Sequence, residues 1–554
     1  MKVLGINRIH NSAVTYLENG ELKFHLENER LSNIKYDSYP FLTLNKLVNY
    51  TDNIDLMGIA GCAKLQEFES FTNMDVYSEY VQGLNRSFLE HSFTFYDYWN
   101  NHHFLHAAHA FYNSGFDTAL CIVKDGMGSE YSINDPNFKP GSYGREISSV
   151  FEGSYPADFF EIERDVYVPF SCDYTKDYVT FTNTVSEGLA FQKTAKHFGF
   201  HELDAGKVMG MASYGKPDNN LPPIYVQGKI NPKLFNNELS ETKEVLLNTK
   251  NYPYLDTDDF QIQANFARAL QKATQEKVLQ DIIRLSNQTG HKNICLSGGY
   301  FLNCVANYYY QQNLPKDINI YIEPISSDAG TSWGAAKYLH HTTTKDTTKR
   351  PLKTLYTGLQ HTLTLNDIQT TTYEKTDAKT VAKLISEGKI VAIYQGRSEG
   401  GPRALGNRSI LFDPRHPDGK DIVNTVKNRE WFRPFAGTVL LEKANEWFNM
   451  AGLVESPYMM YAVNTLPDKI ETIPAINHVD NTCRIQTLTK DQNPLFYDLI
   501  KEFENITGVP ILFNTSFNLA GDCIVETIDH AIETLKKSKI DCLYVPELGV
   551  LIHE

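Results

Sequence analysis

FDTALCIVKDGMG, residues 116–128, is an apolar run that ends in an aspartate and a glycine-bearing turn. KNICLSGGYFLN, residues 292–303, repeats this pattern. At the amino terminus, VLGIN, AVTYL and ELKFHLE read as three successive strands, with Asn19-Gly20 as a hairpin signal before the last of them. Helical periodicity lies between these groups of strands, most clearly in residues 263–290. Strands that alternate with helices predict an α/β fold.

The length of the chain and one polar stretch predict two domains. At 554 residues the chain is several times longer than an ordinary domain. HHTTTKDTTKRP, residues 340–351, has no apolar residue and follows the helix-like GAAKYL. We therefore place a first domain at residues 1–340, a linker at 341–352 and a second, smaller α/β domain at 353–554.

Composition and charge argue against several classes of protein. The chain is 42% apolar and 21% charged, as is typical of globular proteins. A formal net charge of −15 works against nonspecific adhesion to DNA or to anionic membranes. Eight scattered cysteines without a CxxC pair fit a reducing compartment. There is no signal-peptide core and no run of about 18 apolar residues, so we expect a cytoplasmic protein with no membrane association.

Four histidines fall within HHFLHAAHAF, residues 102–111. His102 and His106 are one helical turn apart, so their imidazoles share a face and could hold one metal ion such as zinc, iron, copper or nickel. Asp125 and Asp328 lie at strand-to-helix junctions, which meet at one edge of an α/β sheet, and are the natural carboxylate ligands. The alternative is a histidine pair bonded to other partners, with two aspartates that cap helices or form turns.

Candidate anion-binding groups occur in both predicted domains. Gly298 and Gly299 form a turn where backbone N–H groups can approach phosphate oxygens, and Asn303 follows, although purely structural turns would look similar. Residues 397–433 carry eight Lys or Arg against five Asp or Glu. Guanidinium groups on rigid turns suit bidentate phosphate binding, with an ion-pair network as the alternative. The candidates in the second domain are Arg403, Arg408, Lys427, Arg429, Arg433, Asn514 and Ser516.

The sequence resembles the ATP-dependent O-carbamoyltransferases of antibiotic tailoring and nodulation-factor decoration. The matching segments, in family order and spread over nearly the whole chain, are LGINRIHNSAV, ENERLS, HHFLHAAHAF, VKDGMG, GKVMGMASYG, LSGGYFLNCVAN, SDAGTSWGAA, GPRALGNRSILFDPR, VKNREWFRPF and FNTSFN. The resemblance implies an amino-terminal domain similar to the threonylcarbamoyl-transfer proteins, on the actin/hexokinase-like fold. It also implies a smaller carboxy-terminal α/β domain similar to the threonylcarbamoyl-adenylate synthases.

The resemblance further implies a division of labour between the domains. The carboxy-terminal domain would join carbamoyl phosphate to ATP, which brings Mg²⁺, and give carbamoyl adenylate and pyrophosphate. The amino-terminal domain would hold this adenylate at a divalent metal, usually iron (Fe²⁺), while an acceptor hydroxyl attacks.

Roles are carried over from the family position by position. The implied metal ligands are His102, His106, Asp125 and Asp328. The residues implied beside the adenylate are Gly298, Gly299 and Asn303. Those implied near the attacking hydroxyl are His10 and Asp204. The implied ATP and carbamoyl phosphate ligands are Arg403, Arg408, Lys427, Arg429, Arg433, Asn514 and Ser516. We expect His103 and His109 to face elsewhere.

Four positions depart from the family pattern and leave the acceptor open. Asn11 replaces an aspartate, Ser398 and Gly400 alter the GRSEGGPRALG segment, and Gly437 replaces a proline. The acceptor hydroxyl could belong to a small molecule, a sugar, or a hydroxymethyl-pyrimidine nucleotide or DNA. Threonylcarbamoyl transfer to tRNA and a non-catalytic nucleotide-binding regulatory protein are the alternative functions. The oligomeric state, including a homo-oligomer, also stays open.

Overall fold

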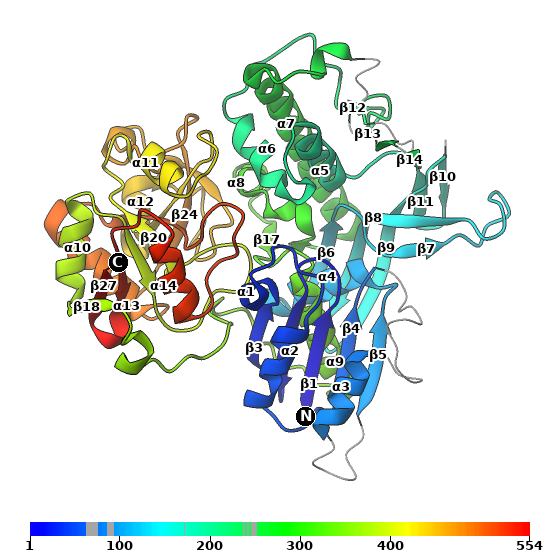
Figure 1. Ribbon diagram of the computed structural model, residues 1–554. Coiled ribbons are helices and arrows are strands. Elements are labelled where there is room, and N and C mark those ends of the chain that lie inside the picture. The colour runs from blue at the N-terminus through cyan, green and yellow to red at the C-terminus, as the bar shows by residue number, and fades with distance from the viewer. Residues whose placement is uncertain are drawn as a thin grey trace. The chain divides into compact units, whose positions relative to one another are not determined.

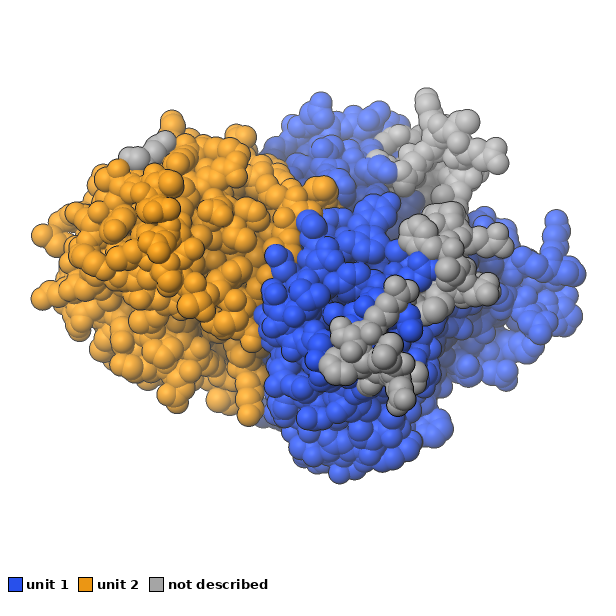
Figure 2. Space-filling view, turned by 60° about the horizontal axis from the view of Figure 1, so that its bottom comes forward, with its two compact units in different colours: residues 1–28, 37–306, 313–352 blue, residues 29–36, 307–312, 353–554 orange. Residues whose placement is uncertain are grey.

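The computed structural model describes residues 1–62, 76–85, 93–170, 172–235, 239–240, 243–244, 247 and 252–553 (Figure 1). The chain divides into two compact units. Unit 1 comprises residues 1–28, 37–306 and 313–352, and unit 2 comprises residues 29–36, 307–312 and 353–554 (Figure 2). Both units combine helices with sheets, which confirms the α/β prediction. Within the described ranges, no helix combines the length and apolar content that crossing a membrane requires.

The first sheet of unit 1 begins with the predicted β-meander. Its strands are β1 (Lys2–Asn7), β2 (Ala13–Glu18), β3 (Glu21–Glu27), β4 (Leu56–Ala60) and β5 (Thr94–Tyr98). They lie in the order β3-β2-β1-β4-β5. The pairs β1–β2 and β2–β3 are antiparallel, whereas β1–β4 and β4–β5 are parallel. Asn19 and Gly20 both have positive φ, as a tight hairpin turn requires.

The second sheet of unit 1 repeats this topology. Its central strands are β6 (Thr118–Lys124), β8 (Tyr143–Ser154), β9 (Asp158–Tyr167), β16 (Asn293–Ser297) and β17 (Asn319–Ile322). Their order is β9-β8-β6-β16-β17, again with two antiparallel pairs followed by two parallel pairs. The additional strands are β7 (Glu130–Ser132), β10 (Asp173–Lys176) and β11 (Val179–Thr182). This duplication is the arrangement of the actin/hexokinase-like fold, as expected for the amino-terminal domain.

Two helices of unit 1 each pack on one of its sheets and also pack against each other. Helix α4 (His102–Ser114) packs its alanines and Phe111 on the β6 residues Ala119, Cys121 and Val123. Helix α9 (Ala329–Thr344) packs on the first sheet. The helices approach each other closely, since a Cβ on Gly334 would lie 2.1 Å from the main-chain oxygen of residue 105 in α4.

The remaining helices and strands before residue 353 are short, except for α7. Helix α7 (Phe260–Thr289) ends at Gly290 in a left-handed conformation, as predicted. The other helices are α1 (Glu29–Ser32), α2 (Phe41–Asn45), α3 (Val76–Asn85), α5 (Glu187–His197), α6 (Ala205–Ala212) and α8 (Cys304–Asn313). The shortest strands are β12 (Tyr225–Val226), β13 (Lys229–Ile230), β14 (Leu239–Ser240) and β15 (Lys243–Glu244).

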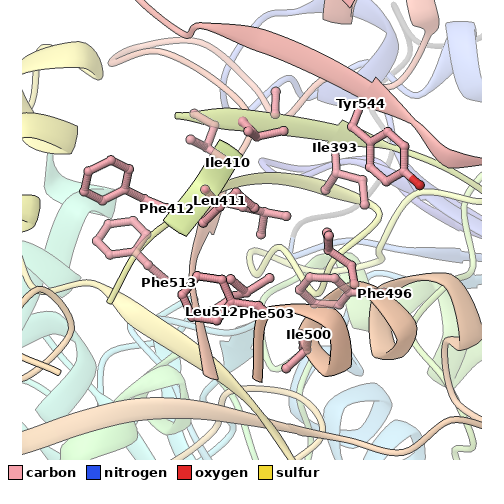
Figure 3. Packing of buried hydrophobic residues seen from close by; sticks show 14 of the residues in the cluster. Ile393, Ile410, Leu411, Phe412, Phe496, Ile500, Phe503, Leu512, Phe513 and Tyr544 are labelled. Atoms are coloured by element: carbon pink, nitrogen blue, oxygen red, sulfur yellow. The ribbon is translucent and has the colours of Figure 1, made fainter. Parts of the chain in front are cut away.

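Unit 2 is built on one mixed sheet in the order β18-β27-β26-β19-β20-β25-β21-β24-β23-β22. Its strands are β18 (Thr372–Lys375), β19 (Val391–Tyr394), β20 (Arg408–Phe412), β21 (Ala436–Leu440), β22 (Phe448–Asn449), β23 (Ala462–Thr465), β24 (Thr482–Leu488), β25 (Ile511–Ser516), β26 (Cys542–Val545) and β27 (Val550–His553). Its helices are α10 (Ala378–Ser386), α11 (Gly419–Val426), α12 (Ala444–Trp447), α13 (Pro494–Thr507) and α14 (Ile528–Lys536). Figure 3 shows Phe496, Ile500 and Phe503 of α13 in the hydrophobic core with Ile393 and Leu512 of the sheet.

The unit boundaries differ in detail from the predicted domain limits. Helix α9 continues to Thr344, so the predicted linker at 341–352 begins inside a helix. The segments 29–36 and 307–312 are grouped with unit 2 although they precede the linker in sequence. Segments this short carry no compositional signal that would predict their place.

Candidate metal centre and anion site

The four predicted metal ligands come together in unit 1. His102 and His106 occupy successive turns of α4, Asp125 follows β6, and Asp328 precedes α9. All four are buried, and one donor atom from each lies within 4.8 Å of the others. His102 Nε2 is 3.3 Å from both His106 Nε2 and Asp125 Oδ2. Asp328 Oδ1 is 3.7 Å and 3.8 Å from the same two imidazole nitrogens.

These distances and donor types fit one divalent metal ion. Ligand atoms bonded to an ion at about 2.1 Å are separated by roughly 3–4 Å in tetrahedral or octahedral geometry. The four separations given above, 3.3–3.8 Å, fall in that interval. Imidazole nitrogens with carboxylate oxygens suit iron, zinc and other first-row ions, and do not select among them.

Backbone and hydroxyl groups orient the ligands. Ser297 Oγ, at the end of β16, lies 3.4 Å from His106 Nδ1. The Gly299 N–H donates to Asp125 Oδ1 at 3.1 Å. Gly298 has φ +95°, and a Cβ there would lie 2.3 Å from the last main-chain oxygen of β6, so this turn requires glycine. The predicted Gly298-Gly299 turn therefore shapes the metal centre, and its contact with adenylate stays a prediction.

The electrostatics of the centre favour a positive charge. Burial by itself would raise the pKa of Asp125, but the hydrogen bond with His102 and the charge of His106 hold that pKa well below its usual range. Burial also opposes the ionisation of His102, yet Cys62, Asp328 and Asp125 raise the pKa of His102 well above its ordinary value. A cation at this position is therefore stabilised by the surrounding carboxylates.

His10 reaches the centre from the turn between β1 and β2. Its Nε2 lies 3.3 Å from Asp328 Oδ2, and the charge of Asp328 raises the pKa of His10. The His10 side chain is 45% exposed, so a ligand can approach it from solvent. Asp204 is not a member of the four-residue cluster and pairs with Lys207 at 3.0 Å just before α6. The role of Asp204 near the acceptor stays a prediction.

The other two histidines of α4 face away from the four ligands, as expected. His103 Nδ1 lies 2.9 Å from Ser149 Oγ. The His109 ring packs against Trp333, with 5.3 Å between the ring centroids. Burial lowers the pKa of both histidines well below the ordinary value, so both are neutral and structural.

Asn303 has a clear structural role. Its Nδ2 donates to Gln271 Oε1 at 2.8 Å, which joins the start of α8 to α7. Its Oδ1 accepts from the Ala306 N–H at 3.1 Å and caps α8. The predicted position of Asn303 beside the adenylate stays a prediction.

Unit 2 holds a cluster of cations in which Lys427 is buried and the arginines are partly buried. Burial lowers the pKa of Arg429, and the charges of Arg433, Arg484 and Arg403 lower it further. Burial and the charges of Arg429 and Arg433 likewise lower the pKa of Lys427. Because these like charges repel one another away from water, a bound anion would stabilise them.

The FNTSFN segment lies against this cation cluster. Lys427 Nζ donates to the main-chain oxygen of Ser516 and, at 3.0 Å, to Asn518 Oδ1. Asn514 lies two residues earlier on β25, where its Nδ2 donates to Thr438 Oγ1 at 2.9 Å. The structure therefore places Ser516 in contact with Lys427, and Asn514 lies on the same strand as Ser516.

Arg408 differs from the other predicted anion-binding residues. It is fully buried, and its guanidinium lies over the Tyr394 ring at 3.7 Å. Its N–H groups donate to the main-chain oxygens of Gly396 and Glu526 at 3.1 Å and 3.2 Å. Because protein partners already use these donors, we remove Arg408 from the anion site and assign it a structural role.

Both halves of the chain match known families. Residues 64–337 match the family model described as carbamoyltransferase N-terminus, and residues 382–551 match the one described as carbamoyltransferase C-terminus. The nodulation protein NolO of Bradyrhizobium diazoefficiens is 31% identical over 80% of this chain and 77% of its own length. The chain belongs to the carbamoyltransferase family. The protein is therefore a transferase enzyme.

Other carbamoyltransferase relatives are similarly distant. The nodulation protein NolNO of Sinorhizobium fredii is 30% identical over 97% of this chain and 78% of its own. Among solved structures, T. kodakarensis HypF aligns at 13% identity and a TM-score of 0.36, over 62% of this chain and 47% of that one. The fold assignment accordingly rests on the strand order of unit 1.

Two residues near the sites of this carbamoyltransferase were not predicted from the sequence. Cys62 follows β4 and affects the pKa of His102 through its charge and a hydrogen bond. Arg484 lies on β24, and its charge lowers the pKa of Arg429. The sequence TCRIQTL reads as an ordinary strand, so no local signal identifies Arg484 as a member of the cation cluster.

Proposed function

We propose that this carbamoyltransferase uses carbamoyl phosphate and ATP to carbamoylate a hydroxyl group, in two half-reactions at two sites. In the first, carbamoyl phosphate, ATP and water give carbamoyl adenylate, phosphate and pyrophosphate. In the second, an acceptor oxygen attacks the carbamoyl carbon and AMP leaves. One observation carries the proposal: the chain holds a partly buried cation cluster in one unit and a cluster of two imidazoles and two carboxylates in the other.

The first half-reaction suits the cation cluster of unit 2. It brings the triphosphate of ATP, with its Mg²⁺, together with a second anion. Arg403, Arg429 and Arg433 can bind phosphate oxygens through paired N–H groups. Lys427, whose Nζ donates to Ser516 and Asn518, would hold the FNTSFN segment beside them. Fixed cations of this kind also stabilise the charge that develops as pyrophosphate leaves.

The second half-reaction suits the metal centre of unit 1. His10 is the group placed to accept the proton of the attacking hydroxyl, because it is half exposed and Asp328 stabilises its charged form. When bound by the four ligands, a divalent ion would polarise the carbamoyl carbonyl. The burial of the four ligands would limit the access of water to the labile anhydride.

Exchange of labelled pyrophosphate into ATP tests the first half-reaction. We expect exchange that depends on carbamoyl phosphate. Incubation with ATP, carbamoyl phosphate and candidate acceptors, followed by mass spectrometry, tests the second half-reaction. The candidates are small hydroxyl compounds, sugars, hydroxymethyl-pyrimidine nucleotides, DNA and tRNA.

The outcomes separate the proposal from its alternatives. Modification of tRNA and of no other candidate would support a threonylcarbamoyl-type transferase instead. Nucleotide binding with neither exchange nor product would support a regulatory protein. Exchange in the absence of carbamoyl phosphate would contradict the proposed donor.

A further inference from the structure

We propose that Glu323 is a positioning residue for the metal centre: its carboxylate fixes the loop that carries Asp328 to the helix that carries His102 and His106. The inference rests on the metal centre of the proposed function. Glu323 touches none of the four ligands, so it acts through the two elements that present them.

Each carboxylate oxygen of Glu323 has its own partners. Glu323 follows β17 and is fully buried. Its Oε1 accepts from the N–H of Ile325, two residues ahead in the loop, at 3.1 Å. Its Oε2 accepts from Asn113 Nδ2 of α4 at 3.0 Å and from the Tyr321 hydroxyl at 3.1 Å. His109 Nε2 of α4 lies 3.6 Å from Oε1. The side chain therefore bridges the loop and α4.

Main-chain hydrogen bonds of Glu323 hold the start of the loop in place. The Glu323 N–H donates to the main-chain oxygen of Leu296 at 3.0 Å, one residue before Ser297 of the metal centre. The Glu323 main-chain oxygen accepts from the Ser326 hydroxyl, which closes the turn that leads to Asp328. Bonds to Glu323 thus hold the first part of the loop, as far as Ser326.

A buried carboxylate at this position is costly, which argues that it has a specific use. Burial raises the pKa of Glu323 to about 7. The nearest compensating cation is Lys337, which reaches it through Asn113: Lys337 Nζ donates to Asn113 Oδ1 at 2.6 Å. An apolar side chain would fill the same space more cheaply, but it could not accept hydrogen bonds from the loop and from α4 together.

Glu323→Gln tests the inference without changing the size of the side chain. The amide keeps one acceptor oxygen, so its NH₂ must face either the Ile325 N–H or Asn113 Nδ2, which are both donors. We expect the loop to shift relative to α4 and the affinity for Co²⁺ to fall about 10- to 100-fold, the effect typical of residues that orient metal ligands. The visible absorption of bound Co²⁺ should also change, because it reports ligand geometry.

Asp37→Asn is the matched control. Asp37 is also buried, and it accepts from the N–H of Tyr39, two residues ahead, at 2.9 Å and from Asn28 Nδ2 at 2.7 Å. It makes the same kinds of bond as Glu323 but touches neither α4 nor the 323–328 loop in these contacts. Its Co²⁺ affinity and spectrum should match those of the unsubstituted protein, even if both variants lose thermal stability.

The outcomes are distinct. Unchanged Co²⁺ affinity and spectrum in Glu323→Gln would overturn the inference and leave Glu323 with a role in folding alone. Should Glu323→Gln not fold, Ser326→Ala breaks the same turn, and it must weaken Co²⁺ binding more than Asp37→Asn does for the inference to stand. If the unsubstituted protein itself binds no Co²⁺, the metal centre of the proposed function fails, and this inference fails with it.

Discussion

At the scale of single residues, the clustered cations of unit 2 affect stability and ligand affinity in opposite directions. In the free protein, burial and the charges of Arg433 and Arg484 lower the pKa of Arg429, so its charge destabilises the fold. The same positive charge attracts phosphate. Removal of the charge from an anion-binding residue should therefore raise the stability of the ligand-free protein. Removal of the charge from a residue that stabilises the fold should lower it.

Arg429→Met should raise the melting temperature of the ligand-free protein, because it removes one of several mutually repelling charges that are partly withdrawn from water. It should also reduce the stabilisation by ATP and carbamoyl phosphate, with the affinity falling by roughly 10-fold or more. Thermal unfolding with and without these ligands measures both effects.

Arg408→Met is the control for this prediction. It removes the guanidinium donors to the main-chain oxygens of Gly396 and Glu526 and the guanidinium over the Tyr394 ring, so it should destabilise unit 2 by about 3 kcal/mol with or without ligand. If Arg429→Met destabilises the protein as Arg408→Met does, Arg429 is a structural residue and not an anion ligand.

At the scale of elements, the metal centre depends on the close approach of α4 and α9. Helix α4 carries both histidine ligands, and α9 follows directly after Asp328. A Cβ on Gly334 would lie 2.1 Å from a main-chain oxygen of α4, which cannot move without moving the helix. Any side chain at this position must therefore push the helices apart.

Gly334→Ala should consequently lower the free energy of unfolding by about 2 kcal/mol or more and weaken metal binding. Denaturant unfolding and Co²⁺ titration measure the two effects. Alanine has a higher helix propensity than glycine, so without a clash this substitution would not destabilise the protein. A variant that is as stable as the original and binds Co²⁺ equally well would therefore show that the helices do not meet as described.

The sequence predicts elements better than it predicts the directions of side chains. The meander, the glycine-ended strands and α7 follow from periodicity and turn residues, and the i, i+4 spacing places His102 and His106 on one face. The direction of the Arg408 side chain could not be predicted, because residue spacing along a loop does not show which side-chain donors will bond to main-chain oxygens. Arg484 joins the cation cluster only through the pairing of β24 with β21, a contact distant in sequence.

At the scale of the whole molecule, unit 2 includes two short segments, 29–36 and 307–312, that precede the predicted boundary. Arg30, on α1, is fully buried, and its Nη2 donates to the main-chain oxygen of Gly401 at 2.6 Å. Asn307 Nδ2 donates to the main-chain oxygen of Met460 at 3.0 Å. A fragment cut at the predicted boundary would lose both contacts.

The fragment 353–554 should therefore be less stable than unit 2 within the full chain, and it should not catalyse pyrophosphate exchange at the full rate. Gly401 belongs to the GRSEGGPRALG segment, which also carries Arg403. In the fragment, the main-chain oxygen of Gly401 would lose its charged donor, Arg30. Thermal unfolding and exchange assays on the purified fragment measure this. A fragment with full stability and full exchange activity would contradict the assignment of residues 29–36 and 307–312 to unit 2.

The account as a whole claims that two separate sites share one carbamoylation reaction. The most direct test measures both half-reactions on His106→Ala and Arg433→Ala. We expect His106→Ala to keep carbamoyl phosphate-dependent pyrophosphate exchange and to lose acceptor carbamoylation, and Arg433→Ala to lose exchange by about 10²-fold or more. If both variants fail at the same half-reaction, the two-site account is contradicted.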